Sequence, residues 1–230
     1  LRNFKLSCLY FSFSDVLVRW LCISRYVYVS WGEAVGMSYR LAGVVVGSGY
    51  VPDVLVAVSR GGLVPARIVS DVVGVDDVYS IKASLWGVGG KVFDDVLLHR
   101  VELPVGGRKV LVVDDVVDSG STLTKVVEYV KLFKPADVRT AVIHVKPTSK
   151  YLPDYYVSKL DVWVWVIYPW TLHEVIYSTL YKQYGCRLIS FDAESIINEF
   201  KKLTELTVSE VTPESLNAAK QRYLSKLCSN

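Results

Sequence analysis

Cysteine, histidine and methionine are scarce in this sequence of 230 residues, which contains four, three and one of them. The cysteines form no CxxC pair and the histidines form no local group, so neither type has the spacing of a zinc or iron–sulfur site. We also find no export signal. We therefore expect reduced thiols and a cytoplasmic protein rather than a disulfide framework.

An excess of one charge and long apolar runs are also missing. The formal net charge is +3, which is too small to indicate nucleic-acid binding by itself. The apolar and aromatic stretch at residues 1–29 is interrupted by Asp15 and Arg19, too early for a membrane span. With 51% hydrophobic and 21% charged residues, the chain is expected to form one globular domain with small additions.

Two common nucleotide-binding patterns, GxxxxGK[ST] and GxGxxG, do not occur. The stretch from Val110 to Thr124, VLVVDDVVDSGSTLT, has a different arrangement. Its first four residues are apolar and mostly β-branched, which predicts a strand that is buried on both faces and ends at Asp114 and Asp115. Asp118, a turn of small residues and apolar residues at helical spacing follow.

Each part of this acidic loop has a chemical use. Residues 119–122 (Ser-Gly-Ser-Thr) would direct backbone N–H groups, hydroxyls and a helix N-terminus at one point, which suits a phosphate monoester, and Gly120 leaves room for close approach. Asp114 and Asp115 are adjacent acceptors suited to vicinal sugar hydroxyls and a hard cation. Asp118 lies between the two groups, within reach of the sugar's reacting carbon. The alternative is a strand end with solvated acids and a serine N-cap.

At these residues the chain resembles a known family. VLVVDDVVDSGST is similar to the phosphoribosyl-diphosphate (PRPP) binding motif of the type I phosphoribosyltransferases, and most similar to their xanthine–guanine and hypoxanthine–guanine branch. The resemblance implies that Asp114 and Asp115 hold the ribose hydroxyls and are linked to Mg²⁺ through water. It also implies that Asp118 takes a proton from the purine ring, and that the 5′-phosphate is bound by Asp118, Ser119, Gly120, Ser121 and Thr122.

A second candidate phosphate site follows the strand predicted at Asp53–Val58. Its residues are Ser59, Arg60, Gly61 and Gly62. A glycine pair beside an arginine can wrap a diphosphate, because the backbone amides come close and the guanidinium adds charge. Alone, the pattern is also that of an ordinary strand-to-helix turn. In the family it resembles, this is the pyrophosphate loop, which often has a non-proline cis peptide at the residue with the basic side chain.

The resemblance also implies a base-binding site. Lys146 follows the strand predicted at Asp137–Val145 and matches a lysine that donates to the 6-oxo group of the purine. Trp165 matches the aromatic residue on which the base stacks, and Val166 the residue that contacts the base edge through its backbone. Without the resemblance, a lysine at a strand end is usually solvated and a tryptophan in an apolar run is usually part of the core.

One position departs from the family pattern. After Pro169–Trp170 the family has an acid, whereas this chain has Thr171, and Glu174 is the nearest carboxylate. The resemblance therefore does not imply that Thr171 contacts a metal or the pyrophosphate.

Sequential strand–helix units with valine-rich strands predict an α/β fold with an open, mainly parallel sheet and helices on both faces. We expect an N-terminal extension at residues 1–29 that lies outside the working protein, and a phosphoribosyltransferase domain with a small hood at 30–190. Two capped helices would form a C-terminal appendage at 191–230. A capping box at Ser30–Glu33 predicts the first helix, and the glycine-rich residues 86–91 are either a closing loop or a surface turn.

These features predict a purine phosphoribosyltransferase of purine salvage. It would use PRPP, Mg²⁺ and a 6-oxopurine (guanine, hypoxanthine or xanthine) and release a nucleoside monophosphate and diphosphate. The resemblance implies a homo-oligomer, dimer or tetramer, without a membrane or nucleic-acid partner. Two alternatives stay open: the same PRPP motif with another base (adenine, orotate or uracil), and a regulator of the same fold that binds nucleic acid.

Overall fold

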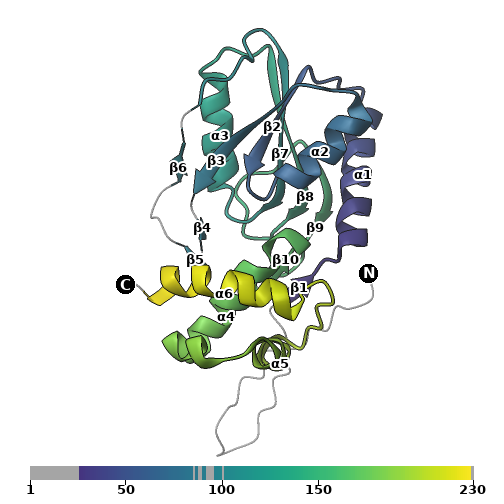
Figure 1. Ribbon diagram of the computed structural model, residues 1–230. Helices are drawn as coiled ribbons and strands as arrows, with labels where there is room; N and C mark the ends of the chain where they lie inside the picture. The colour runs from purple at the N-terminus through teal and green to yellow at the C-terminus, as the bar shows by residue number, and fades with distance from the viewer. Residues whose placement is uncertain (1–25, 85, 88–89, 92–95, 100, 229–230) are drawn as a thin grey trace, which may run out of the picture.

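The centre of the molecule is a six-stranded sheet, in a computed structural model that describes residues 26–84, 86–87, 90–91, 96–99 and 101–228 (Figure 1). The strand order is β6-β3-β2-β7-β8-β9, and every neighbouring pair is parallel except β3 with β6. The strands are β2 (Val54–Ser59), β3 (Val78–Ser84), β6 (Leu97–Leu98), β7 (Lys109–Val117), β8 (Asp137–Val145) and β9 (Tyr155–Lys159). The prediction of an open, mainly parallel sheet is confirmed.

Helices cover both faces of this sheet, as predicted. They are α1 (Trp31–Gly47) and α2 (Leu63–Val73) on one face, and α3 (Ser121–Lys131) on the other. Alternate residues of each central strand enter two separate cores: Leu55 and Ala57 of β2 face α1 and α2, whereas Val54 and Val56 face α3. Burial on both faces explains why these strands are continuous apolar runs in the sequence.

A second group of elements lies below the sheet in Figure 1. The hood consists of β10 (Trp165–Ile167), which pairs in parallel with β1 (Tyr26–Tyr28), and of the helix α4 (Leu172–Tyr184). The appendage consists of α5 (Ala193–Thr204) and α6 (Pro213–Cys228), which share a third core with α4. The short 3₁₀ helices η1 (Pro169–Thr171) and η2 (Gly185–Ser190) lie at the two ends of α4.

The N-terminal end of the described chain is joined to the hood. Val27 pairs with Val166 of β10, and the N–H group of Val29 donates to the carbonyl of Ile167 (2.9 Å). Residues 26–29 of the predicted extension therefore form part of the described fold. The predicted capping box follows directly, because the Ser30 side chain accepts from the Glu33 N–H group and the Glu33 carboxylate accepts from the Ser30 N–H group.

Three local predictions differ from the structure. The strand β7 does not end at Asp114 but continues to Val117, because β8 pairs with it as far as Val145. Neither β9 nor β1 was predicted. In the glycine-rich segment, β4 (Trp86–Gly87) pairs with β5 (Gly90–Lys91) in a hairpin whose two central residues lie outside the described part of the chain, so a closing motion remains a prediction.

The expectation of reduced thiols is wrong for one pair of cysteines. Cys186 of η2 and Cys228 of α6 form a disulfide, with Cα atoms 5.8 Å apart. The two residues are 42 positions apart in the sequence, so their proximity depends on how α4 and α6 pack and is not visible in the local spacing. Of the described helices, none is both long and apolar enough to cross a membrane.

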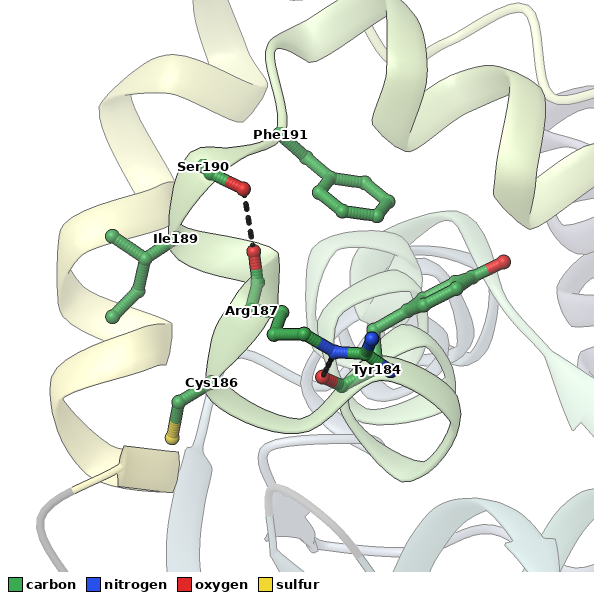
Figure 2. A pocket seen from close by; sticks show the side chains of 6 residues that line it. All are labelled: Tyr184, Cys186, Arg187, Ile189, Ser190 and Phe191. Atoms are coloured by element: carbon green, nitrogen blue, oxygen red, sulfur yellow. Dashed lines mark hydrogen bonds between the residues drawn. The ribbon is translucent and has the colours of Figure 1, made fainter.

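A shallow pocket lies beside this disulfide (Figure 2). It is lined by Tyr184, Cys186, Arg187, Ile189, Ser190 and Phe191. The turn at its wall is closed by the Ser190 hydroxyl, which donates to the Arg187 carbonyl (2.9 Å). None of the predicted site residues lines this pocket, so it is separate from the edge of the sheet described next.

Candidate active site

The carboxyl ends of β2, β7 and β8 lie at one edge of the sheet, because these strands are parallel neighbours. The segments that follow them are the predicted diphosphate turn after β2, the acidic loop at the end of β7, and Lys146 after β8. The fold thus brings three predicted parts of the site to a single edge, the usual place for ligands in open α/β sheets.

Asp118 accepts hydrogen bonds from three side chains at this edge. Lys146 Nζ donates to Oδ2 (2.8 Å), while Thr148 Oγ1 (2.8 Å) and Trp163 Nε1 (3.2 Å) donate to Oδ1. Because both carboxylate oxygens are engaged, the side chain is held in one orientation. An ionised carboxylate has about four lone-pair sites, so Oδ2, which accepts only from Lys146, is the oxygen that can also accept from a substrate.

Lys146 is enclosed by aromatic rings. Its side chain is only 6% exposed, and Nζ lies 4.5 Å from the ring centre of Trp163 and 5.7 Å from that of Trp165. The two indoles meet edge to face, with centres 6.2 Å apart. Cation–π attraction and the ion pair with Asp118 together stabilise this buried ammonium. The predicted base-binding residues Lys146 and Trp165 are thus brought together beside Asp118.

Val166, the third predicted base-binding residue, follows Trp165 within β10. Its side chain is buried in the core that the hood shares with α1 and the sheet. Only its backbone is therefore a candidate for contact with a base, which is the contact that the resemblance implies.

Asp115 is the more enclosed member of the acidic pair. Trp170 Nε1 donates to its Oδ2 (2.9 Å), and the Tyr168 hydroxyl donates to its backbone carbonyl (2.9 Å). Burial raises the pKa of Asp115 to about 6, although the Trp170 hydrogen bond acts in the opposite direction. Loss of solvent, and then the charge of Asp115, raise the pKa of Asp114 well above its usual value. Hydroxyl donors or a cation placed here would offset this unfavourable charge.

A buried histidine supports the acidic pair from β8. His144 Nδ1 lies 2.6 Å from the Tyr168 hydroxyl oxygen. Because Tyr168 gives its single proton to the Asp115 carbonyl, we assign the proton of the His144 ring to Nδ1, which donates to Tyr168. Burial lowers the pKa of His144 to about 4. The imidazole is therefore neutral at pH 7 and positions Tyr168 without adding charge.

The diphosphate turn has the backbone that the resemblance implied, with a cis peptide between Ser59 and Arg60. Its two glycines lie where the chain packs too closely for a side chain. A Cβ atom on Gly61 would lie 2.5 Å from Asp115 Oδ2, and one on Gly62 would lie 2.2 Å from a backbone oxygen of β7. The backbone contact requires glycine at position 62, and a side chain at position 61 would displace the Asp115 carboxylate. Both contacts place the turn directly against the acidic loop.

Arg60 extends from this turn toward the hood and appendage. Its side chain is 72% exposed and forms an ion pair with Glu174 of α4. Thr171 is turned to its own backbone, because its hydroxyl donates to the Tyr168 carbonyl (2.9 Å). From this part of the chain, the carboxylate that reaches the diphosphate turn is therefore that of Glu174, three residues after the position where the family has an acid.

The predicted phosphate turn, residues 119–122, is built around Gly120. This residue precedes α3 as its N-cap and has a φ of 90°, a conformation that favours glycine. A Cβ atom there would lie 2.6 Å from Cβ of Tyr151. The hydroxyls of Ser119 and Ser121 lie 3.0 Å apart. The amides of the first helical turn, including that of Thr122, have no partner within an α-helix, so they are suited to bind a phosphate together with these hydroxyls.

Comparison with known proteins agrees with this geometry. Residues 38–174, more than half of the chain, match the family model of the phosphoribosyl transferase domain. The chain belongs to the phosphoribosyltransferase family. Over 153 residues it is 33% identical to a xanthine-guanine phosphoribosyltransferase from Cereibacter sphaeroides, covering 63% of this chain and 86% of that protein.

Two further relatives support the assignment. A xanthine-guanine phosphoribosyltransferase from Idiomarina loihiensis is 31% identical over 119 residues, which cover 52% of this chain and 71% of that protein. The crystal structure of a purine phosphoribosyltransferase from Pyrococcus horikoshii is similar with a TM-score of 0.55 and 30% identity, over 64% of this chain and 94% of that one. The predicted family, its fold and its enzyme class are confirmed.

Several residues of this phosphoribosyltransferase site were missed in the sequence. Trp163 and Thr148 bind Asp118, and the chain from His144 through Tyr168 supports Asp115. A signal existed for Trp163, because it lies two residues before Trp165 and alternate residues of an extended segment point to the same side. No sequence signal identified His144, because its partner is 24 residues away.

The acidic pair is also the natural place for a cation in a phosphoribosyltransferase. Within the described residues, no group of three or more His, Cys, Asp or Glu side chains could hold a metal ion alone. Asp114 and Asp115 nonetheless present carboxylate oxygens, and their pKa values are raised by burial and, for Asp114, also by the charge of Asp115. This donor set fits Mg²⁺ that is bound mainly through substrate oxygens, with the two acids in support.

Proposed function

We propose that this phosphoribosyltransferase transfers the 5-phosphoribosyl group of PRPP to a 6-oxopurine, in the presence of Mg²⁺. The observation that carries the proposal is the contact between Lys146, Trp165 and Asp118 at the edge that also holds both phosphate turns. Lys146 offers only hydrogen-bond donors, which suits the oxygen at position 6 of guanine, hypoxanthine or xanthine. The names of the curated relatives, both xanthine-guanine phosphoribosyltransferases, support the same choice.

Each part of PRPP has a partner at this edge. The 5′-phosphate would bind the amides and hydroxyls of residues 119–122, with Asp118 beside it. The ribose hydroxyls would donate to Asp114 and Asp115 and so replace the solvation that both carboxylates have lost through burial. The diphosphate would lie against residues 59–62, where the glycine backbone permits close approach and Arg60 supplies charge.

The reaction exchanges one bond for another at the anomeric carbon of ribose. The bond from this carbon to the diphosphate oxygen breaks, the diphosphate leaves with the electron pair, and a ring nitrogen of the purine forms the new bond. The transition state is cationic, so the charge of Asp118 stabilises it. When bound, Mg²⁺ would neutralise part of the charge of the diphosphate.

Asp118 would also receive the proton that the purine nitrogen loses. In the substrate-free arrangement its Oδ2 accepts from Lys146. When a base binds, Lys146 can turn to the 6-oxo group, and the freed Oδ2 can accept the ring N–H group. The ion pair thus holds both residues in the base site until the substrate separates them.

Asp118→Asn tests this proposal. The amide keeps the shape of the side chain but loses both the base and the charge, so kcat should fall by roughly two orders of magnitude or more while PRPP binding is nearly unchanged. Steady-state kinetics and direct titration of PRPP give the two quantities separately. Unchanged turnover in the variant would remove Asp118 from the mechanism.

We further propose that the protein is a homo-oligomer, a dimer or tetramer, which works in the cytoplasm without a membrane or nucleic-acid partner. The proposed oligomeric state, compartment and partners rest on the resemblance to the family. The base site favours an enzyme over a regulator of the same fold, because a regulator needs neither Asp118 nor a purine pocket.

A further inference from the structure

The resemblance to the family assigns a role to Trp165 but none to Trp163, two residues earlier. Trp163 lies in the segment 160–164, which leads from β9 at the edge of the sheet to β10 in the hood (Figure 1). Its Nε1 donates to Asp118 Oδ1 (3.2 Å), and its ring centre lies 4.5 Å from Lys146 Nζ. Trp163 therefore contacts both members of the ion pair that a purine would separate.

The segment that carries Trp163 is fixed to the sheet. The Leu160 N–H group donates to the carbonyl of Val145 (2.8 Å), the residue before Lys146. The side chains of Leu160 and Val164 are buried in the core that the hood shares with α1 and the sheet. Trp163 itself is 38% exposed, so a substitution there should leave this core intact.

Thr148 reaches the same oxygen of Asp118 from the loop after β8. Its hydroxyl donates to Oδ1 at 2.8 Å. This loop is joined to the phosphate turn, because the Lys150 N–H group donates to the Ser119 carbonyl (3.1 Å). The two donors to Oδ1 therefore come from two segments that are anchored separately.

The two oxygens of the Asp118 carboxylate are not equivalent in this arrangement. An ionised carboxylate has about four lone-pair sites, two on each oxygen. Trp163 and Thr148 fill both sites of Oδ1, whereas Lys146 fills one site of Oδ2. The remaining acceptor site is therefore on Oδ2, the oxygen that faces the predicted base-binding lysine.

We propose that Trp163 is a positioning residue for Asp118, and that its N–H group, together with the Thr148 hydroxyl, holds Oδ1 so that Oδ2 receives the purine proton. In this step the N–H bond of the purine ring breaks, its proton moves to Oδ2, and its electron pair forms the bond to the anomeric carbon. Lys146 has by then turned to the 6-oxo group, so the carboxylate would rotate unless Oδ1 were held. The inference rests on the proposed function in one respect, that Asp118 takes the proton of the base.

Trp163→Phe is the direct test, because it keeps an aromatic ring beside Lys146 and removes only the donor to Asp118. Since a hydrogen bond to the catalytic carboxylate is lost, the rate constant of transfer should fall by about three- to tenfold. Single turnovers of the full-length protein with PRPP, Mg²⁺ and hypoxanthine measure it. KM for the purine and for PRPP should stay within about twofold, because the indole N–H group would bind neither substrate. An unchanged rate constant would overturn the role of Trp163.

The same substitution in the Asp118→Asn background tests whether Trp163 acts through the carboxylate. If it does, Trp163→Phe should change the residual transfer rate of Asp118→Asn by less than about twofold. A loss of the same factor in both backgrounds would show that Trp163 supports the base site in general, and would overturn its role as a positioning residue.

Trp170→Phe is the matched comparison. It also removes an indole N–H group from a carboxylate, but this group donates to Asp115 Oδ2 (2.9 Å). Because Asp115 would hold a ribose hydroxyl, Trp170→Phe should raise KM for PRPP more than it lowers the rate constant of transfer. If both variants instead lowered the rate constant equally with unchanged KM for PRPP, the cause would be a general loosening of the hood, and the inference would fail.

These outcomes separate the inference from the proposed function. If Asp118→Asn loses activity as expected but Trp163→Phe transfers at the wild-type rate, only the inference fails. If the wild type uses another base and no 6-oxopurine, the proposed substrate fails while the inference is measured with that base. Wild-type turnover in Asp118→Asn, or a wild type that transfers to no base, overturns both.

Discussion

The charged residues of the site are paired in ways that a substrate can replace. Asp118 and Lys146 neutralise each other at 2.8 Å, and Arg60 pairs with Glu174. Asp115 differs, because its carboxylate accepts from the neutral Trp170 indole and burial raises its pKa to about 6. The first two pairs keep cationic groups in position for a base and a diphosphate, whereas burial disfavours the charged forms of both Asp114 and Asp115 in the empty site.

Trp165→Ala should affect the base much more than PRPP. Stacking of a base on an aromatic face is worth about 1–3 kcal/mol, so KM for the purine should rise by one to two decades while KM for PRPP changes little. Trp163→Phe is the comparison, since it keeps a ring beside Lys146 and removes only the N–H donor to Asp118. Equal rises in both KM values for Trp165→Ala, together with a lower melting temperature, would show that Trp165 is a core residue.

Asp115 should make the stability of the substrate-free protein depend on pH. Its folded pKa of about 6 lies above its usual value of 3.8, so the folded state binds the proton more tightly, and this contribution to stability is lost as pH rises from about 4 to about 6. Asp115→Asn removes this loss and also removes the charge that raises the pKa of Asp114, and both effects favour the variant as pH rises. The free energy of unfolding of the variant should therefore increase relative to the wild type across this window, by on the order of 1–3 kcal/mol at pH 7.

Denaturant unfolding at several pH values measures this difference. His144 acts in the opposite direction, because its pKa of about 4 lies below 6.5 and the protein loses stability as pH falls through that range. The effect of His144 is present in both proteins and largely cancels in the comparison. A difference in stability that does not change between pH 4 and pH 7 would contradict the assignment for Asp115.

Among the elements, the central strands of the sheet were predictable from local patterns, whereas the edge strand β9 and the strand pairing within the hood were not. Valine-rich runs identified β2, β7 and β8, since burial on both faces leaves a local pattern. The length of β7 depends on pairing with β8, and β1 and β10 exist because segments about 140 residues apart pair with each other. The disulfide was missed for the same reason, because it joins residues that are 42 positions apart.

The substitution Gly61→Ala tests whether PRPP binding needs the close packing of the diphosphate turn against the acidic loop. In Gly61→Ala the new Cβ would lie 2.5–2.6 Å from the Asp115 carboxylate, which must move and lose its hydrogen bond from Trp170. We expect KM for PRPP to rise about tenfold or more and the melting temperature to fall.

Gly43→Ala in α1 is the control for this substitution. Nothing lies within 4 Å of a Cβ atom there, and alanine favours the helix, so stability should rise by up to about 1 kcal/mol with unchanged kinetics. Thermal unfolding gives the melting temperature, and steady-state kinetics give KM for PRPP, for both variants and the wild type. A Gly61→Ala protein with wild-type KM for PRPP would show that the turn tolerates a side chain and that its close contact with Asp115 is not needed.

For the whole molecule, the sheet provides one edge and the hood provides the base site over it. Asp118 comes from the end of β7 and Lys146 from the end of β8, while Trp163 and Trp165 come from the segment that leads into the hood. Purine and PRPP would therefore meet where the edge of the sheet and the hood converge, and the choice of base depends on the contact of Lys146 with position 6.

The preference among bases is the measurement that tests this account most directly. Adenine has an amino group at position 6, so it would face the Lys146 ammonium with donors only and leave a buried charge without its partner. A site that depends on such a contact can discriminate by about 10⁴, and we expect kcat/KM for hypoxanthine or guanine to exceed that for adenine by at least about a hundredfold. Assays of the unmodified protein with PRPP, Mg²⁺ and each base give the ratio. Comparable kcat/KM values for adenine and hypoxanthine would contradict the role of Lys146 and, with it, the assignment to 6-oxopurines.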